Sequence, residues 1–307
     1  MLELVGHIDL PPHAGPGGFD HAAVHGPRRR VYVAHTANDA VDVIDCVTQT
    51  YVRSIAGLAG VAGALVSDEH DLVFTSNRGE NTVGIVRADG DEVLATIPVG
   101  VKPNGLAYDP GRQVLLAANV GDPSRPGSFT LTMVDVAARA VVADVPVAGR
   151  TRWAIFDPAT DCFYVNIADP AEIAVVEANA PGKVARTFPI PAAGPHGLDL
   201  DPAAQRLYCA CDAARLIAVD TRSGAVTGHV EIGGVPDVVF FNPRRQRLYV
   251  AIGDPGLIEV VETASLRRRQ VVHTERGAHT TAFDPATEML YAFLPGTHRA
   301  AVYRDRA

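Results

Sequence analysis

A seven-fold internal repeat constrains the fold of this chain more than any other feature. In the clearest copy, Asp201-Pro202 is followed five residues later by Leu207-Tyr208, and the same pattern recurs along the sequence. An aromatic residue or leucine marks each copy: Tyr32, Phe74, Leu116, Tyr164, Tyr208, Tyr249 and Tyr291. Successive markers are 41 to 48 residues apart. A period in this range is typical of propellers and of stacked repeats.

Each copy contains the pattern of four short strands. In the fifth copy, apolar runs cover Gly197–Leu200, Leu207–Ala210 and Leu216–Asp220, and a fourth run leads into glycine or proline, as Val93–Gly100 does in the second copy. Asp-Pro, Asp-Gly and Ser-Gly turns separate the runs, as hairpins require. The sequence therefore predicts an all-β chain, with residues 1–307 forming a single seven-bladed β-propeller of four-stranded antiparallel blades.

The two ends of the chain complement each other. The last copy stops after its third strand, at Ala301–Tyr303, whereas Gly6–Leu10 parallels Gly228–Ile232, the fourth strand of the fifth copy. We expect the N-terminal strand, Leu4 to Leu10, to pair with Ala300 to Tyr303 and to close the last blade. Such closure removes an open sheet edge, which would otherwise favour aggregation.

Two short motifs resemble the YVTN β-propeller repeat family. Val31-Tyr32-Val33-Ala34 and Leu248-Tyr249-Val250-Ala251 match its Leu-Tyr-Val-Ala run, and Pro103-Asn104-Gly105-Leu106-Ala107 matches the start of its innermost strand. The resemblance covers essentially the whole chain and implies the propeller fold. It does not imply one function, because related propellers include enzymes, electron-transfer partners and binding scaffolds.

Composition excludes some partners. The chain has 27 Lys and Arg against 35 Asp and Glu, a net charge of −8, so a nucleic-acid partner is disfavoured. No apolar run approaches the roughly 18 residues of a membrane span, and the first residues lack a basic segment followed by an apolar one. We expect a cytoplasmic protein. The four cysteines show no zinc or redox spacing and are expected to be buried thiols.

Polar residues recur at the position where each innermost strand begins. Counting back from each Asp-Pro turn, these strand-start residues are Asp20, Ala62, Asn104, Arg152, His196, Asp237 and His279. A second set lies three residues after the marker, where the second strand of a blade reaches the same face: His35, Asn77, Asn119 and, among apolar residues, Cys211. Asn166 occurs one residue earlier in its own copy. We expect both sets at the mouth of a central channel.

These residue types suggest a metal site facing an anion site. Two imidazoles and two carboxylates, with a third imidazole nearby, suit a divalent metal whose identity stays open. The predicted ligands are His196, His279, Asp237, Asp20 and His35. Arg152 is expected on the opposite side of the channel, where its fork can bind a small anionic molecule with help from Asn104, Asn77, Asn119 and Asn166. His196, His279 and Arg152 are the predicted catalytic residues.

Two long loops are predicted on the same face and could partly cover this site. Asn119–Ser128 lengthens the third copy, and Pro11–Gly18 extends the approach to the first. Long loops on a rigid scaffold often carry function, although a tolerated surface insertion explains them equally well.

Three functions are consistent with this arrangement. The first is a metal-dependent lyase or hydrolase that acts on a small anionic molecule at the channel mouth. The second is a non-catalytic propeller that binds a protein partner or a small ligand, with the polar ring simply solvated or holding the blades in register. The third is a lactonase-like enzyme. The sequence does not identify the substrate or the oligomeric state.

Overall fold

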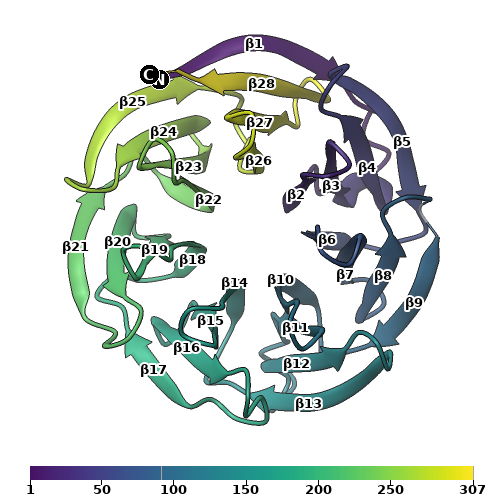
Figure 1. The fold of residues 1–307 in the computed structure, drawn as a ribbon, viewed down its shortest axis with the longest axis vertical. Helices are drawn as coiled ribbons and strands as arrows, with labels where there is room; N and C mark the ends of the chain where they lie inside the picture. The colour runs from purple at the N-terminus through teal and green to yellow at the C-terminus, as the bar shows by residue number, and fades with distance from the viewer. Residues whose placement is uncertain (91, 307) are drawn as a thin grey trace.

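Seven four-stranded antiparallel sheets form a ring in the computed structural model, which describes residues 1–90 and 92–306 (Figure 1). Within blades 1 to 6 the chain runs from the innermost strand outward, and strands adjacent in sequence are paired. The arrangement confirms the predicted all-β, seven-bladed propeller.

The first four blades follow one another along the chain. Blade 1 contains β2 (Ala22–His25), β3 (Arg30–His35), β4 (Ala40–Asp45) and β5 (Thr50–Ala56). Blade 2 contains β6 (Val61–Ser67), β7 (Leu72–Asn77), β8 (Thr82–Arg87) and β9 (Val93–Pro98). Blade 3 contains β10 (Pro103–Asp109), β11 (Val114–Asn119), β12 (Thr130–Asp135) and β13 (Ala140–Pro146). Blade 4 contains β14 (Thr151–Asp157), β15 (Cys162–Ile167), β16 (Glu172–Glu177) and β17 (Arg186–Pro189).

The remaining blades complete the ring. Blade 5 contains β18 (Pro195–Asp201), β19 (Arg206–Cys211), β20 (Arg215–Asp220) and β21 (Val226–Glu231). Blade 6 contains β22 (Val235–Asn242), β23 (Arg247–Asp254), β24 (Leu257–Glu262) and β25 (Arg267–His273). Blade 7 combines β26 (Thr281–Asp284), β27 (Met289–Leu294) and β28 (Arg299–Asp305) with β1 (Leu2–Asp9). A single 3-10 turn, η1 (Thr36–Asn38), links β3 and β4 among the described residues.

The N-terminal strand closes the ring as predicted. β1 pairs antiparallel with β28, with Leu4 opposite Tyr303 and Ile8 opposite Ala300. The two chain ends consequently lie side by side at the outer edge of blade 7 (Figure 1). The outer edge of β28 is therefore paired, and blade 7 has four strands like the other blades.

The repeat markers hold neighbouring blades together. All seven lie on the second strand of their blade and are fully buried. The Tyr32 hydroxyl of blade 1 donates a hydrogen bond to the Ala88 carbonyl of blade 2, and the Tyr164 hydroxyl of blade 4 donates one to the Thr221 carbonyl of blade 5. The aromatic ring thus fills the space between sheets while the hydroxyl satisfies a backbone acceptor of the next blade.

The innermost strands begin irregularly. The pairing of β18 with β19 shifts between Pro195 and Gly197, and that of β14 with β15 shifts between Thr151 and Ala154. A β-bulge changes the direction in which a side chain points. In these two blades the bulged segments contain the strand-start residues His196 and Arg152. We call the side of the ring where the innermost strands begin the mouth face, and the side where they end in Asp-Pro turns the turn face.

Glycine follows several strand-start residues because the next blade approaches closely. A Cβ atom on Gly105 would lie 2.3 Å from the carbonyl oxygen of Arg152, and one on Gly197 would lie 2.1 Å from that of Asp237. Both distances are far inside van der Waals contact, so only glycine fits without a backbone shift.

Blades 1 and 4 carry large rings at the position that glycine occupies in the fifth blade. These rings are His21 and Trp153, and their centroids are 4.2 Å apart although they come from blades on different sides of the ring. The two rings therefore meet inside the channel, at a level between its mouth face and its turn face.

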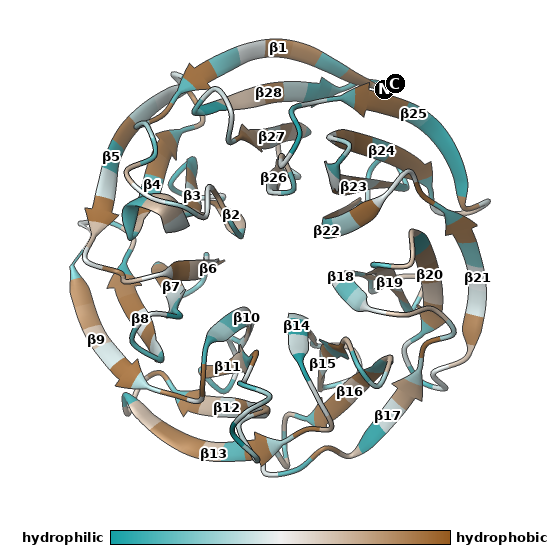
Figure 2. Ribbon diagram, turned by 180° about the vertical axis from the view of Figure 1, so that it is seen from behind, coloured by the Kyte–Doolittle hydropathy of each residue, from teal (hydrophilic) through white to brown (hydrophobic). Residues whose placement is uncertain are grey.

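The outermost strand of blade 6 is largely hydrophilic (Figure 2). Figure 2 shows a long hydrophilic stretch along β25, which begins with three arginines. Among the described residues, no helix is long and apolar enough to cross a membrane.

Candidate functional site

Four consecutive blades bring their strand-start residues into contact at the mouth face. His196 Nε2 lies 3.2 Å from Asp237 Oδ1, and His279 Nε2 lies 3.7 Å from Asp237 Oδ2. Arg152 Nη1 lies 3.1 Å from His196 Nε2. Together with Asp212, these residues are referred to below as the mouth group.

Asp212 was not predicted from the sequence. It follows the last residue of β19, and its Oδ1 lies 2.7 Å from His196 Nδ1. The sequence pattern selected Cys211, three residues after the marker, but the Cys211 side chain is fully buried inside the blade. The next residue, in the loop, is the one that reaches the channel. A carboxylate on Nδ1 fixes the ring orientation of a histidine and leaves Nε2 to face a ligand.

The charges around His196 favour its protonated form. Burial alone would lower its pKa, but the charge of Asp237 and hydrogen bonds to Asp212 and Asp237 raise the pKa to about 9. The reciprocal interaction with His196 keeps the pKa of Asp237 far below the usual range, against the effect of its burial. Nε2 cannot donate to Asp237 and accept from Arg152 at the same time. With both carboxylates present, we assign His196 as a donor from both nitrogens, with the guanidinium lying beside it.

Arg152 was predicted to lie across the channel from His196, and this prediction was wrong. It is adjacent to His196 because blades 4 and 5 are neighbours in the ring. Asp212 is the one carboxylate that the described residues place in an ion pair with it, at 3.5 Å from Nη2. Arg152 Nε is buried without a hydrogen-bond partner among the described residues. One guanidinium donor, Nε, therefore has no protein acceptor, but it lies below the surface.

Asp20 belongs to a neighbouring pair. Its carboxylate lies 3.2 Å from Arg78 Nη1 and 3.4 Å from His21 Nε2. Burial lowers the pKa of His21, although the charges of Asp20 and Asp237 oppose this effect. Since Asp237 acts on His21, the two groups face the same space, but no contact joins Asp20 to His196 or His279 among the described residues.

His35 is not available as a ligand at the mouth. It is fully buried in blade 1, with Nδ1 2.7 Å from Asp42 Oδ2 and Nε2 2.7 Å from His13 Nδ1. Both ring nitrogens are thus occupied, and the ring also packs 4.5 Å from that of Phe19. The expectation that His35 joins a metal site with the strand-start residues does not fit this placement.

Two of the predicted asparagines, Asn77 and Asn119, bond within their own blades, whereas Asn166 bonds to the next blade. The amide nitrogen of Asn77 donates to Thr82, that of Asn119 to Thr130 and Thr132, and that of Asn166 to the carbonyls of His196 and Gly197. Asn104 is buried, and its Oδ1 has no partner among the described residues. Of the four, Asn166 alone hydrogen-bonds a mouth-group residue among the described residues, through the His196 backbone.

The mouth group shows no preformed metal centre among the described residues. Within residues 1–90 and 92–306, no group of three or more His, Cys, Asp or Glu side chains could hold one. The guanidinium of Arg152, 3.1 Å from the Nε2 donor of His196, places a permanent positive charge where a cation would bind.

A basic pocket adjoins the mouth group. It has a volume of about 310 Å³ and is lined by Arg78, Lys102 and Arg150 together with the insertion of blade 3, including Gly121 and Phe129. No acidic side chain lines it. Arg150 and Lys102 form no ion pair among the described residues, and the positive charge of Arg150 adds to burial in lowering the pKa of Arg152. The predicted long loop of blade 3 therefore lies beside three cationic side chains, those of Arg78, Lys102 and Arg150.

Fold and site together define a seven-bladed β-propeller with a charged group at its channel mouth. No protein-family model and no curated protein sequence matches the chain. It is similar to the structure "Crystal Structure of Mitotic Checkpoint Complex", with a TM-score of 0.84 and 14% identity over 99% of this chain and 92% of that chain. It is similar to "Kuenenia stuttgartiensis Hydrazine Synthase", with a TM-score of 0.84 and 14% identity over 96% of this chain and 97% of that chain. At this identity the likeness shows the shared fold, and the YVTN resemblance stays a prediction.

Proposed function

We propose that this propeller binds a small anionic molecule at its channel mouth and transfers a proton to it from His196. The observation that carries the proposal is the contact between Arg152 and His196, each of which is held by Asp212. An arginine with free donors binds an anion, and an oriented imidazolium beside it is a general acid.

The cations around the mouth favour an anion over a neutral ligand. Arg150 and Lys102 line the basic pocket and form no ion pair among the described residues, and the charge of Arg150 acts on Arg152. Within the mouth group itself, the carboxylates of Asp212 and Asp237 are balanced by Arg152 and protonated His196. The uncompensated positive charge therefore lies on the basic pocket, where a carboxylate or phosphate would be bound.

His196 is suited to act as a proton donor and not as a base. Because the pKa of His196 is about 9, the imidazole carries its proton at neutral pH. In a hydrolysis, Nε2 would give this proton to the leaving-group oxygen while the attacking water releases a proton to solvent. In an elimination, the proton lost from carbon would pass to solvent water. In both cases the imidazole recovers its proton from solvent. Asp237, with its lowered pKa, is a poor base and holds the ring by charge. This assignment corresponds to the lyase or hydrolase class expected from the sequence.

The test compares R152K with unmodified protein in titrations with citrate and sulfate. Lysine keeps the charge but loses the fork, so we expect at least about tenfold weaker binding. R269K, an exposed arginine on β25, is the matched control and should bind as the unmodified protein does. Equal affinity in R152K, with no anion beside Arg152 in crystals grown in citrate, would favour a scaffold that binds a protein partner.

A divalent metal remains a separate prediction for this site. Elemental analysis of untagged protein, before and after incubation with zinc, iron, manganese or nickel, tests it. A bound ion should be lost in acid, because imidazole ligands must be neutral. If no ion is retained at neutral pH, the metal-dependent form of the function is excluded while anion binding is unaffected.

A further inference from the structure

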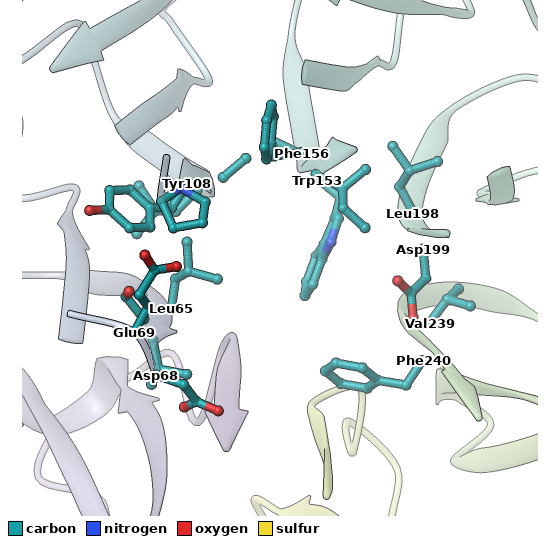
Figure 3. Close-up of a pocket in the computed structure, with 17 residues that line it drawn as sticks. Leu65, Asp68, Glu69, Tyr108, Trp153, Phe156, Leu198, Asp199, Val239 and Phe240 are labelled. Atoms are coloured by element: carbon teal, nitrogen blue, oxygen red, sulfur yellow. The ribbon is translucent and has the colours of Figure 1, made fainter. Parts of the chain in front are cut away.

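The turn face of the channel opens into a second, chemically different chamber. Its volume is about 450 Å³, within the usual range for small-molecule sites. Figure 3 shows the Trp153 indole projecting into its middle, with Tyr108 and Leu65 on one side and Phe240 on the other. Trp153, Phe156 and Phe240 each keep part of their surface exposed to this space. The wall is therefore a set of aromatic faces available to a ligand.

Every charged side chain that lines the chamber is acidic. The charged lining residues are Asp68, Glu69 and Asp199, and no Lys, Arg or His is among the lining residues. Asp68 is partly engaged, since it accepts the Gly26 N–H at 3.1 Å and lies 3.4 Å from the buried His25. The chamber thus differs in sign from the basic pocket on the mouth face.

Asp199 is the deepest of these carboxylates. It lies on β18, and Figure 3 shows it directed toward the space between Trp153 and Phe240. Its oxygens accept the backbone N–H groups of Leu200, at 2.8 Å, and Phe241, at 2.6 Å. The described residues provide no cationic partner for it. A partly buried carboxylate without a counter-charge, bordered by aromatic rings, is complementary to a cation that carries an apolar body.

We propose that this chamber binds a small protonated amine with an aromatic or aliphatic body. The ammonium group would pair with Asp199, and the aromatic faces of Trp153 and Phe240 would stabilise it further. The apolar body would displace water from Leu65 and Phe156. An anion is disfavoured because it would meet three carboxylates. The proposal rests on residues other than the mouth group and is independent of the function proposed for that group.

The pH dependence of binding follows from Asp199. Burial raises its pKa to about 7, against the two backbone hydrogen bonds. The other titratable groups bordering the chamber and its connection to the mouth are Asp68, Glu69, Tyr108 and His21. Since the protonated amine pairs with the ionised form of Asp199, affinity should be highest near pH 8, below the pKa of an alkylamine, and should fall by up to about tenfold per unit below pH 7.

Trp153 is the single tryptophan of the chain and reports occupancy directly. The experiment titrates the full chain with 2-phenylethylamine, 2-phenylethanol and 3-phenylpropionate, which differ mainly in charge, and follows Trp153 emission. We expect the amine to bind at least about tenfold more tightly than the alcohol, and the acid more weakly than both. D199N should reduce this preference for the amine. D9N, on an exposed residue of β1, is the control and should keep it.

Two further measurements separate this site from the mouth group and from a folding defect. R152K should bind the amine as unmodified protein does, because Arg152 does not line the chamber. If D199N does not fold, the pH profile of unmodified protein decides. Equal affinity for amine and alcohol, or an amine affinity that does not change between pH 8 and pH 5.5, would overturn the proposal.

Discussion

Two histidine–aspartate pairs in this molecule have the same contact between Nδ1 and a carboxylate oxygen, but the residues that surround them differ. His196 and Asp212 at the mouth face are joined through Nδ1 at 2.7 Å, and so are His35 and Asp42 in blade 1. His196 Nε2 faces Asp237 and Arg152, and 14% of the side chain is exposed. His35 Nε2 faces His13, and the side chain is fully buried.

The difference shows that an oriented imidazole alone does not make a site. In both pairs the carboxylate fixes the ring, but the second nitrogen decides what the ring can do. Where it points at charged neighbours bordering a pocket, it can exchange a proton with a ligand. Where it is hydrogen-bonded to another protein side chain, as His35 is to His13, the pair stabilises the fold. Ser54, which donates to Asp42 at 2.6 Å, completes such a closed network in blade 1.

The largest expected effect is the loss of stability when His35 is removed. H35A leaves the buried carboxylate of Asp42 without its imidazole partner and empties space beside Phe19. We expect the free energy of unfolding to fall by about 3–5 kcal/mol, measured by denaturant titration. H7A, on an exposed residue of β1, should stay within about 0.5 kcal/mol of the unmodified protein. A loss below about 1 kcal/mol in H35A would show that blade 1 does not depend on this network.

The mouth pair should instead make stability depend on pH. The pKa of His196 is raised from 6.5 to about 9 on folding, so its contribution is complete below about pH 6.5 and is lost as pH rises through 9. The shift corresponds to at most about 3 kcal/mol. Unfolding measured between pH 6 and pH 10 should show this decline in unmodified protein and a flatter profile in H196Q. Identical profiles would mean that His196 is not charged in the folded protein.

A smaller effect is expected from Asp212 alone. D212N removes the carboxylate from Nδ1 but leaves Asp237 on Nε2, so the pKa of His196 should fall by about one unit without returning to its ordinary value. The imidazole resonances in an NMR titration measure it. D39N, which changes a carboxylate outside the mouth group, should leave this titration unchanged. A His196 titration in D212N equal to that of unmodified protein would assign the raised pKa to Asp237 alone.

The repeat made the fold predictable, and it made part of the site predictable too. Because each Asp-Pro turn fixes the register of the strand before it, counting back located Arg152, His196, Asp237 and His279, which the structure brings into contact. Their relative placement was wrong for Arg152, although blade order alone puts blades 4 and 5 side by side. The function of these residues stays a prediction.

The missed residues lie one position beyond those selected. Asp212 follows Cys211, Arg78 follows Asn77 and His21 follows Asp20. In the first two, the strand ends at the selected residue and the following loop residue reaches the mouth. In the third, His21 replaces the glycine that follows the strand-start residue in other blades, as Trp153 does in blade 4. A large ring at a position where other copies have glycine was therefore the sequence signal for His21 and Trp153, whose rings meet in the channel.

The smallest expected effect is spectroscopic and concerns a third histidine. His21 lies beside Asp20, yet burial lowers its pKa, so a neighbouring carboxylate at 3.4 Å does not suffice to charge it. It is therefore neutral at pH 7 and should become protonated only as pH falls below the usual histidine range. A protonated imidazole 4.2 Å from Trp153 should quench the indole emission, because the ring contact is direct. Emission recorded from pH 8 to pH 5 should decrease on the acid side in unmodified protein and stay level in H21Q. If H21Q shows the same decrease, another group quenches Trp153. The experiment would then not support the statement that His21 is neutral at pH 7 while His196 is charged.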